Sequence, residues 1–339
     1  MIAPAPEPSP NANPVPDQRT MDAVRLGLLA WFAANGRDLP WRRTRNPYAI
    51  LVSEIMLQQT QVDRVIPYYR AFLDRFADVR ALASAPTAEV IKAWAGLGYN
   101  RRAVNLQRTA QYVVTELAGV FPSEVAALRQ LPGIGPYTAG AVAAFAFERD
   151  AAFVDTNMRR VLHRVFVGSD VPVPTATERQ ILAFADAAVP PGDGWTWNQA
   201  LIEFGALQCT ARRPACVVCP LQRECRAYPA VQSAIAAQPR GARVKGETKF
   251  AGSNRYYRGR VVAALRESDS EAVGDGIALH ALGPRVRDGF TAADVPWLYG
   301  VVQELARDGL AVAEAIPSYD ADAPGEPTSD PSCVRVRLP

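Results

Sequence analysis

The chain has 339 residues, a formal net charge of +3 at pH 7, 49% hydrophobic residues and 21% charged residues. This composition is typical of a soluble globular protein with two or three domains. No apolar run reaches the roughly 18 residues that would indicate a membrane-spanning helix, so we expect no association with a membrane.

The N-terminal stretch is rich in proline and lacks the basic flank and apolar core of a secretory signal. We therefore expect residues 1–18 to form a disordered tail and the protein to be cytoplasmic. In that compartment, clustered thiols bind metal more often than they form disulfides.

Between residues 19 and 228 apolar residues recur three or four positions apart, for example at Val62, Val65, Ile66 and Tyr69. This period is that of an amphipathic helix. Glycine and proline residues separate the periodic stretches. The pattern predicts an all-α architecture for this part of the chain.

The C-terminal part of the sequence predicts a separate small domain. Residues 229–250 are polar and contain Pro and Gly, which indicates a linker. Residues 251–316 predict helices at 257–267 and 292–308, followed by a strand in GLAVAEA. This order resembles a winged-helix module. Residues 317–339 are rich in Pro, Asp and Ser and predict a loose tail.

Glu54 lies in the segment PYAILVSEIMLQQT, in which Pro47 can begin a helix. Ile50, Leu51 and Leu57 are three or four residues away, so a helix would place the carboxyl group on an apolar face. Burial would raise the pKa of Glu54 by about one unit or more and make it a proton donor near neutral pH. A half-exposed glutamate is the alternative interpretation.

The segment LPGIGPYT, residues 131–138, lies between two predicted helices. Gly133 and Gly135 let the backbone approach a ligand, and Pro136 suits the first turn of a helix. N–H groups at a helix N-terminus bind anions, and the absence of a following Lys-Ser/Thr excludes a nucleotide P-loop. The segment predicts a helix-hairpin-helix that holds a DNA phosphate without reading sequence, and an ordinary turn is the alternative.

Asp155 lies in AAFVDTNMRRV, between an apolar run and a predicted helix. This position suits a helix cap. The alternative is an ionised carboxylate that stabilises a developing cation. Together with a protonated Glu54, such a group suits N-glycosidic cleavage, in which one carboxyl protonates the leaving base and the other stabilises the sugar cation.

Four cysteines lie close together in the spacing C-x6-C-x2-C-x5-C, at Cys209, Cys216, Cys219 and Cys225. A zinc site usually combines two short knuckles, and only the C-x2-C pair forms one here. The wider spacing favours a [4Fe–4S] cluster over zinc or a disulfide. The same loop contains four arginines that suit phosphate contacts, with a solvated loop as the alternative: Arg212, Arg213, Arg223 and Arg226.

These features together resemble the endonuclease III superfamily of helix-hairpin-helix DNA glycosylases, and within it the A/G-specific adenine DNA glycosylases. The resemblance rests on segments that occur in order through residues 20–228: RDLPWRR, SEIMLQQT, AWAGLGYNRR, LPGIGPYTAGAV, VDTNMRRV and NQALIEFGALQCT. It implies a six-helix barrel over residues 47–147 and an iron–sulfur cluster domain made of residues 19–46 and 148–228.

The resemblance implies an enzyme that binds double-stranded DNA, flips adenine out of an A:G or A:8-oxoguanine mispair and hydrolyses its glycosidic bond. Glu54 would donate the proton, Asp155 would stabilise the sugar cation and Asn157 would orient these groups. Tyr137 would lie against the reacting sugar. Because a phenol cannot form the imine that a lysine forms in the lyase branch, we expect base removal without strand cleavage.

The resemblance also implies which residues contact the DNA. Gln59, Thr60 and a turn that contains Leu97 and Tyr99 would enter the duplex near the opposite guanine. The pocket for the flipped base would be lined by five side chains: Arg37, Trp41, Arg42, Leu57 and Glu203. We expect the protein to act as a monomer.

The sequence departs from many members of this family because it lacks the aromatic-Ser-His loop of a Nudix-like C-terminal domain. Residues 251–316 are instead similar to the short C-terminus of actinobacterial relatives, which leaves the preference for 8-oxoguanine open. Two other classes stay open: a T/U mismatch glycosylase acting opposite guanine, and a non-catalytic cluster-bearing protein that binds DNA damage. MLQQT argues against the first, and the presence of both Glu54 and Asp155 argues against the second.

Overall fold

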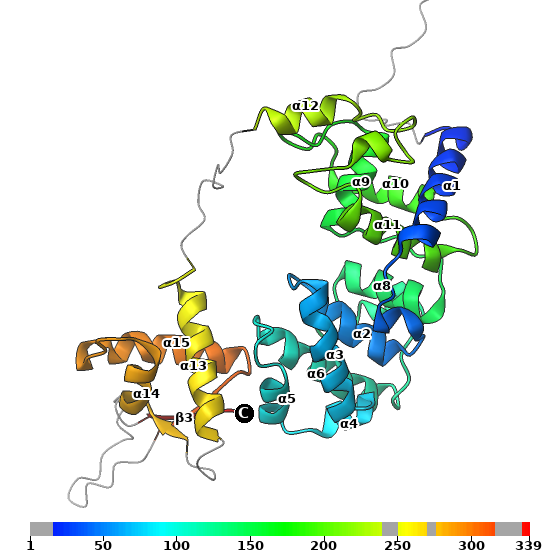
Figure 1. The fold of residues 1–339 in the computed structure, drawn as a ribbon. Coiled ribbons are helices and arrows are strands. Elements are labelled where there is room, and N and C mark those ends of the chain that lie inside the picture. The colour runs from blue at the N-terminus through cyan, green and yellow to red at the C-terminus, as the bar shows by residue number, and fades with distance from the viewer. Residues whose placement is uncertain (1–15, 239–249, 270–275, 316–333) are drawn as a thin grey trace, which may run out of the picture. The chain divides into compact units, whose positions relative to one another are not determined.

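The computed structural model describes residues 16–238, 250–269, 276–315 and 334–339, and these residues are mostly helical, as predicted (Figure 1). In these ranges no helix is both long enough and apolar enough to cross a membrane. The chain forms two compact units. Each unit is made of several chain segments rather than of one continuous half.

Unit 1 comprises Met1–Leu51, Pro122–Gln130 and Ile134–Ala242. Here α1 packs on α11, and α11 packs on α8 and α9. The elements are α1 (Gln18–Asn35), η1 (Pro40–Arg43), the first part of α2 (Pro47–Leu57), α7 (Val125–Leu128), α8 (Pro136–Phe147), α9 (Thr156–Phe166), α10 (Glu178–Ala188), α11 (Gly194–Leu207), η2 (Cys216–Val218) and α12 (Ala230–Ala236).

Two glycines allow the close packing of unit 1. A Cβ atom on Gly140 of α8 would lie 2.6 Å from the Cβ of Phe153, and one on Gly205 of α11 would lie 2.8 Å from the Cβ of Asn157. Either contact is far inside normal van der Waals distance, so a larger residue would push the elements apart. The two glycines therefore hold α8 and α11 directly against the segment that contains Asp155.

Unit 2 comprises Val52–Phe121, Leu131–Gly133 and Arg243–Pro339. In its first part α6 packs against α4 and α5. The elements are the rest of α2, α3 (Val62–Arg75), α4 (Val79–Ser84), α5 (Thr87–Ala93), α6 (Arg101–Glu116), α13 (Asn254–Asp269), β1 (Ile277–Ala278), α14 (Leu279–Val286), η3 (Ala292–Asp294), α15 (Val295–Arg307), β2 (Val312–Ala315) and β3 (Val334–Arg337).

The C-terminal module consists of α13, α14, α15 and an antiparallel sheet in the order β1-β3-β2. The helices predicted at 257–267 and 292–308 correspond to α13 and α15, and the strand predicted in GLAVAEA corresponds to β2. The expectation of a loose tail over 317–339 is wrong for β3, which pairs with both other strands. Val334 and Val336 of β3 are buried while Arg335 is exposed, because strand side chains alternate between two faces.

The C-terminal module shares its hydrophobic core with α5 and α6. Ile91 of α5 and Val104 of α6 belong to the same buried cluster as Val262 of α13 and Leu298 of α15. The backbone N–H of Ala88 also donates a hydrogen bond of 3.0 Å to the carbonyl oxygen of Pro339. The module is therefore packed against the helical part of unit 2 through a common hydrophobic core.

The predicted domains group the chain segments differently from the two observed units. Unit 1 includes α8, whereas the sequence assigned residues 47–147 to one barrel. The predicted linker, 229–250, contains α12. Most of the predicted N-terminal tail, part of the linker and part of the C-terminal tail lie outside the described residues.

Candidate functional site

The hairpin of LPGIGPYT connects α7 to α8. Gly133 has a φ of 77°, a left-handed conformation, and a Cβ atom there would lie 3.0 Å from the Cβ of Asn105. Gly135 is the N-cap of α8, where no side chain caps the helix, and Pro136 follows at the first helical position. The hydroxyl of Thr109 fixes the turn by donating to the carbonyl oxygen of Pro132 at 2.6 Å. This arrangement leaves the first N–H groups of α8 available to an anion.

Glu54 lies in the last turn of α2 and is only 5% exposed, in agreement with the apolar face that the sequence predicts. Ser53 beside it is fully buried. The chain leaves α2 through a turn in which Gln59 is exposed and has a φ of 55°. Leu57 and Thr60 on either side of it are partly buried. Glu54 therefore has the environment expected of a buried acid, and its catalytic role remains a prediction.

Arg102, a residue that the sequence analysis did not single out, holds two turns of unit 2 in place. Its guanidinium lies 2.9 Å from the carbonyl oxygen of Ile55 and 2.5 Å from that of Gln58, at the end of α2. The same group lies 3.3 Å and 3.2 Å from the carbonyl oxygens of Leu97 and Gly98. Burial lowers the pKa of Arg102 to about 10, a value that still leaves it charged at neutral pH. One cation thus ties the Gln59 turn to the turn before α6.

The turn before α6 presents Tyr99 to solvent. Tyr99 has a φ of 46° and is 44% exposed, whereas Leu97 two residues earlier is buried. A left-handed backbone is uncommon for a residue other than glycine. The structure therefore holds an aromatic side chain outward at the position that the family resemblance assigns to the duplex.

Asp155 is the N-cap of α9, so the helix-cap interpretation of this residue is confirmed. Its carboxylate accepts hydrogen bonds from the backbone N–H of Met158 at 2.6 Å and from the side-chain amide of Asn157 at 3.3 Å. Burial raises the pKa of Asp155, while these donors and the charge of Arg160 act in the opposite direction. Asp155 is a partly buried, oriented carboxyl group, and its part in catalysis remains a prediction.

Arg160 connects this carboxyl group to the cysteine loop. Its guanidinium donates to the side-chain oxygen of Asn157 at 2.8 Å, to the carbonyl oxygen of Gly205 at 2.5 Å and to that of Cys209 at 2.8 Å. Arg160 lies in the motif VDTNMRRV, but its contacts could not be predicted from the sequence. Its three partners come from two helices and a loop, and this convergence is visible only in the fold.

Tyr137, the second residue of α8, belongs to the same unit as Asp155. Its ring packs edge-to-face against Phe153 with the ring centres 5.3 Å apart, and Phe153 lies two residues before Asp155. This aromatic contact packs the Tyr137 ring against the segment that leads into Asp155. Glu54 belongs to unit 2, and its pairing with Asp155 across a common site remains a prediction.

Three of the residues predicted to line the base pocket form one ion cluster around a buried carboxylate in unit 1. Glu203 on α11 is fully buried and accepts from Arg37 Nε at 2.6 Å and from Arg42 Nη2 at 2.8 Å. Burial alone would raise the pKa of Glu203, but hydrogen bonds from Arg37 and Arg42 outweigh it and hold the pKa below 4.5. Arg42 also donates to Gln199 at 2.7 Å, and Trp41 beside it is buried. The cluster joins η1 to α11.

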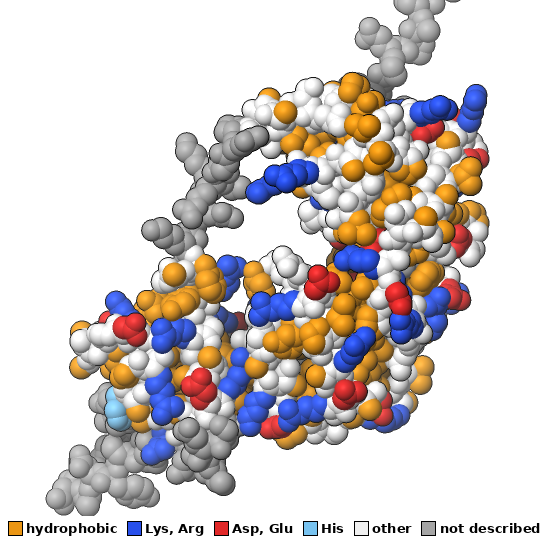
Figure 2. Space-filling model, viewed as in Figure 1, with side chains coloured by type: hydrophobic (Ala, Val, Ile, Leu, Met, Phe, Trp, Pro, Cys, Tyr) orange, Lys and Arg blue, Asp and Glu red, His pale blue; other side chains and the backbone are white. Residues whose placement is uncertain are grey.

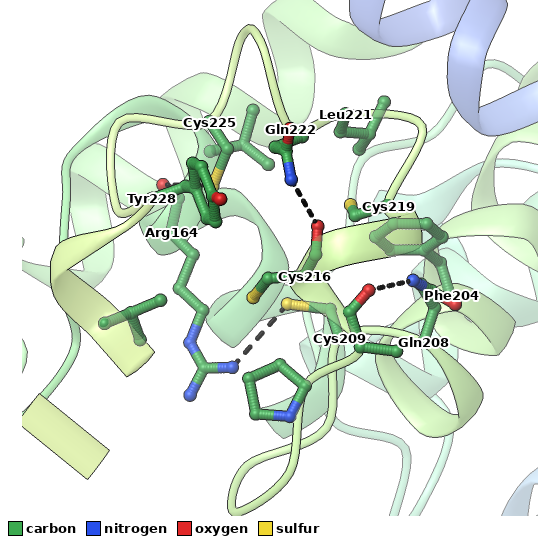
Figure 3. A pocket seen from close by; sticks show the side chains of 14 residues that line it. Arg164, Phe204, Gln208, Cys209, Cys216, Cys219, Leu221, Gln222, Cys225 and Tyr228 are labelled. Atoms are coloured by element: carbon green, nitrogen blue, oxygen red, sulfur yellow. Dashed lines mark hydrogen bonds between the residues drawn. The ribbon is translucent and has the colours of Figure 1, made fainter. Parts of the chain in front are cut away.

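The four cysteines of the C-x6-C-x2-C-x5-C loop line a single cavity (Figure 3). They come from the end of α11, from η2 and from the loop before α12, and their sulfur atoms surround the same space. In the part of the chain that the structure describes, no three His, Cys, Asp or Glu side chains are placed to hold a single metal ion. A set of four thiols around one space fits a larger multi-iron cluster.

The surroundings of the cavity include a buried arginine that the sequence analysis also missed. Arg164 of α9 lies 3.7 Å from the sulfur of Cys209 and 2.6 Å from Asp170. Burial raises the pKa of the thiols, that of Cys219 to about 12. Thiolate ligands in such a place need positive charge nearby, and Arg164 supplies one such charge.

Comparison with known proteins agrees with this geometry. A family model described as "HhH-GPD superfamily base excision DNA repair protein" matches residues 52–185. A solved structure of a thermostable thymine-DNA glycosylase is similar with a TM-score of 0.58 and 32% identity, covering 62% of this chain and 97% of that chain. The helical fold and its hairpin thus define a helix-hairpin-helix DNA glycosylase, which confirms the predicted fold class.

Two curated relatives narrow the family. An adenine DNA glycosylase of Mycolicibacterium smegmatis is 39% identical over 296 residues, which cover 86% of this chain and 97% of the relative. An adenine DNA glycosylase of mouse is 43% identical over 237 residues, which cover 66% of this chain and 46% of the mouse protein. The chain thus spans about half the length of the mouse relative and nearly the whole of the bacterial one. It belongs to the adenine DNA glycosylase family.

Proposed function

We propose that the protein is a monofunctional adenine DNA glycosylase of base-excision repair. It binds double-stranded DNA, extrudes an adenine that is mispaired with guanine or 8-oxoguanine, and hydrolyses the bond between base and sugar. The similarity over nearly the full length of the mycobacterial adenine DNA glycosylase carries this proposal. We also expect a monomer. We expect it in the cytoplasm, where reducing conditions keep clustered thiols free to bind metal.

Two carboxyl groups perform the proposed reaction. Glu54, buried on α2, protonates the adenine ring, and the bond between base and sugar then breaks with the electron pair leaving on the base. Asp155, held by the N–H of Met158 and by Asn157, stabilises the positive charge that develops on the sugar. Water completes the hydrolysis and returns a proton to Glu54. The burial of Glu54 and the partial burial of Asp155 strengthen these electrostatic effects.

Tyr137 supports base removal without strand cleavage. A lyase needs an amine that attacks the sugar and forms an imine, and a phenol at this position cannot supply it. The hairpin, with Gly133 and Gly135, contributes backbone N–H groups to a DNA phosphate. Gln59, Thr60, Leu97 and Tyr99 would contact the duplex, on turns that Arg102 holds together.

Arg37, Trp41, Arg42, Leu57 and Glu203 would line the pocket for the extruded base. The ion cluster of Arg37, Arg42 and Glu203 keeps both guanidinium groups fixed, which supports a role in shaping this pocket. Because Glu203 is fully buried beneath them, it acts as their anchor. The arginines then present the remaining donors of their guanidinium groups.

Cys209, Cys216, Cys219 and Cys225 would hold a [4Fe–4S] cluster. The common cavity and the neighbouring Arg164 fit four thiolates around a charged group. A bound cluster would cross-link the loop and stabilise unit 1. Purified protein should contain about four iron atoms per chain. One zinc per chain would contradict the proposal.

Single-turnover assays on duplexes that carry A:8-oxoguanine, A:G, T:G or U:G test the activity, each with and without alkali. We expect adenine release, with strand breaks only after alkali. Glu54→Gln and Asp155→Asn should abolish release, whereas the exposed control variants Glu116→Gln and Asp186→Asn should retain it.

The same assays distinguish the proposed adenine glycosylase from a T/U mismatch glycosylase. Similarity to the thymine-DNA glycosylase structure, over 97% of that chain, makes a T/U mismatch glycosylase the second candidate. Release of thymine or uracil opposite guanine without release of adenine would support this alternative. DNA binding with no base release from any duplex would instead indicate a non-catalytic protein.

A further inference from the structure

A cavity of about 490 Å³ lies between the C-terminal module and the turn before α6, entirely within unit 2. Residues 98–102 and Asn105 form one wall, and the first turns of α13 with Phe250 form the other. The lining combines two exposed aromatic rings with four guanidinium groups: Tyr99, Phe250, Arg101, Arg102, Arg255 and Arg258. Figure 2 shows that Lys and Arg side chains are spread over the visible face of unit 2.

Three of the four arginines already have partners within the protein. Arg258 pairs with Glu304 at 3.1 Å, and Arg101 lies 3.4 Å from Asp308. Arg102 is surrounded by backbone carbonyl oxygens, as described above. Their charges are therefore largely compensated or fixed in structural contacts.

Arg255 is different, because no carboxylate among the described residues lies within ion-pair distance of it. Its guanidinium donates to the hydroxyl of Tyr99 at 2.9 Å and lies 5.4 Å from the centre of the Tyr99 ring and 5.1 Å from that of Phe250. The side chain is exposed and lines the cavity. It is a cation next to two aromatic rings and available to an anion.

The packing of the module fixes where Arg255 points. Val261 and Val262, two turns further along α13, belong to the core that α13 shares with Ile91 and Val104. The start of α13 is thereby held beside the Tyr99 turn, and its N-terminus favours negative charge. A guanidinium next to two aromatic rings suits a nucleotide, whose phosphate accepts hydrogen bonds and whose base stacks.

We propose that the C-terminal module takes part in DNA binding through Arg255, which binds a backbone phosphate next to the Tyr99 turn while the cavity accepts the attached nucleotide. This inference rests on the proposed function, since it assumes that unit 2 meets the duplex at Tyr99. It assigns to the module a direct contact with DNA in place of a merely structural part.

Equilibrium binding over a salt series tests the inference. The full-length protein is titrated into a fluorescent duplex that carries a tetrahydrofuran abasic analogue opposite guanine, so that no base can be released. Arg255→Gln should weaken binding about tenfold and lower the slope of log K against log salt by about one, the loss of one phosphate contact. Arg255→Lys should restore most of the slope because it keeps the charge.

Two further variants separate this contact from general effects of charge and folding. Arg285→Gln removes an exposed arginine of the same module that does not line the cavity, and it should bind as the wild type does. Phe250→Ala should weaken binding severalfold with an unchanged slope, since stacking releases no counterions. Equal affinity and slope for Arg255→Gln and the wild type would overturn the inference, and so would an equal loss in Arg285→Gln.

The inference and the proposed function can fail separately. If the wild type releases adenine but Arg255→Gln binds as tightly as the wild type, the enzyme is an adenine glycosylase and the module does not use Arg255. If binding depends on Arg255 but the wild type releases no adenine, the contact stands and the proposed activity is wrong.

Discussion

Replacing Glu203 by glutamine should destabilise unit 1 because it removes the only buried counter-charge of the cluster around α11 that the structure describes. The carboxylate accepts from the backbone N–H of Arg37 at 3.0 Å, from two atoms of its guanidinium and from Arg42. The Arg42 side chain is only 8% exposed, whereas that of Arg37 is 33% exposed and can regain water. Breaking a buried pair from one side costs about 3–5 kcal/mol, and the exposure of Arg37 places this case near 3 kcal/mol.

Such a loss corresponds to a fall in Tm of about 6–12 °C for a unit of this size. Differential scanning calorimetry or thermal melting followed by circular dichroism would measure it. The matched control is Asp38→Asn, because Asp38 pairs with Arg43 where both side chains are about two-thirds exposed. That variant should melt at the wild-type temperature.

The pH dependence of the melting temperature, compared between the wild type and Glu203→Gln, supplies a second check. The pKa of Glu203 is held below 4.5 in the folded state, so the folded protein binds fewer protons than the unfolded chain near that pH. Its contribution to stability is therefore complete above pH 4.5 and is lost as the pH falls through the folded pKa. The difference in melting temperature between the wild type and Glu203→Gln should therefore become smaller as the pH falls through that range. A Glu203→Gln protein that melts with the wild type at pH 7 would refute the reasoning.

Three further predictions concern the rest of the molecule. Gly140→Ala should lower the free energy of unfolding by about 1–3 kcal/mol in denaturant titrations, because its Cβ would lie 2.6 Å from that of Phe153. The control is Gly135→Ala, which should leave the free energy of unfolding nearly unchanged because a Cβ there would meet nothing within 4 Å. Because burial raises the pKa of Asp155 above 3.8, the single-turnover rate should fall as the pH drops through that raised value, and a flat acid limb would exclude an ionised Asp155 from the rate-limiting step. Arg102→Gln should weaken duplex binding more than Arg101→Gln, since only Arg102 holds both turns, and equal affinities would contradict its positioning role.

Local sequence patterns were sufficient where a feature depends on neighbours in the chain. The apolar face around Glu54 predicted its burial, and the position of Asp155 before a helix predicted its cap. The short spacing of Cys209 to Cys225 predicted that the thiols would lie together. Each of these depends on helical periodicity, on capping or on a single loop, which operate over a few residues.

Features that depend on distant segments could not be predicted in this way. The role of Arg102 arises from carbonyl oxygens of Ile55, Gln58, Leu97 and Gly98, which the fold brings to one point. Arg160 likewise joins segments that are about fifty residues apart. The short alternation of β3 is too brief to indicate a strand, and its partners on both sides come from elsewhere in the module.

The position of β3 in the middle of the sheet affects how the module can form during synthesis. Both neighbours of β3 are translated before it, so β1 and β2 leave the ribosome without the strand that joins them. Until then, each has backbone N–H and C=O groups that can pair with other nascent chains. The nascent module is accordingly exposed to aggregation for longer than a sheet of consecutive hairpins would be.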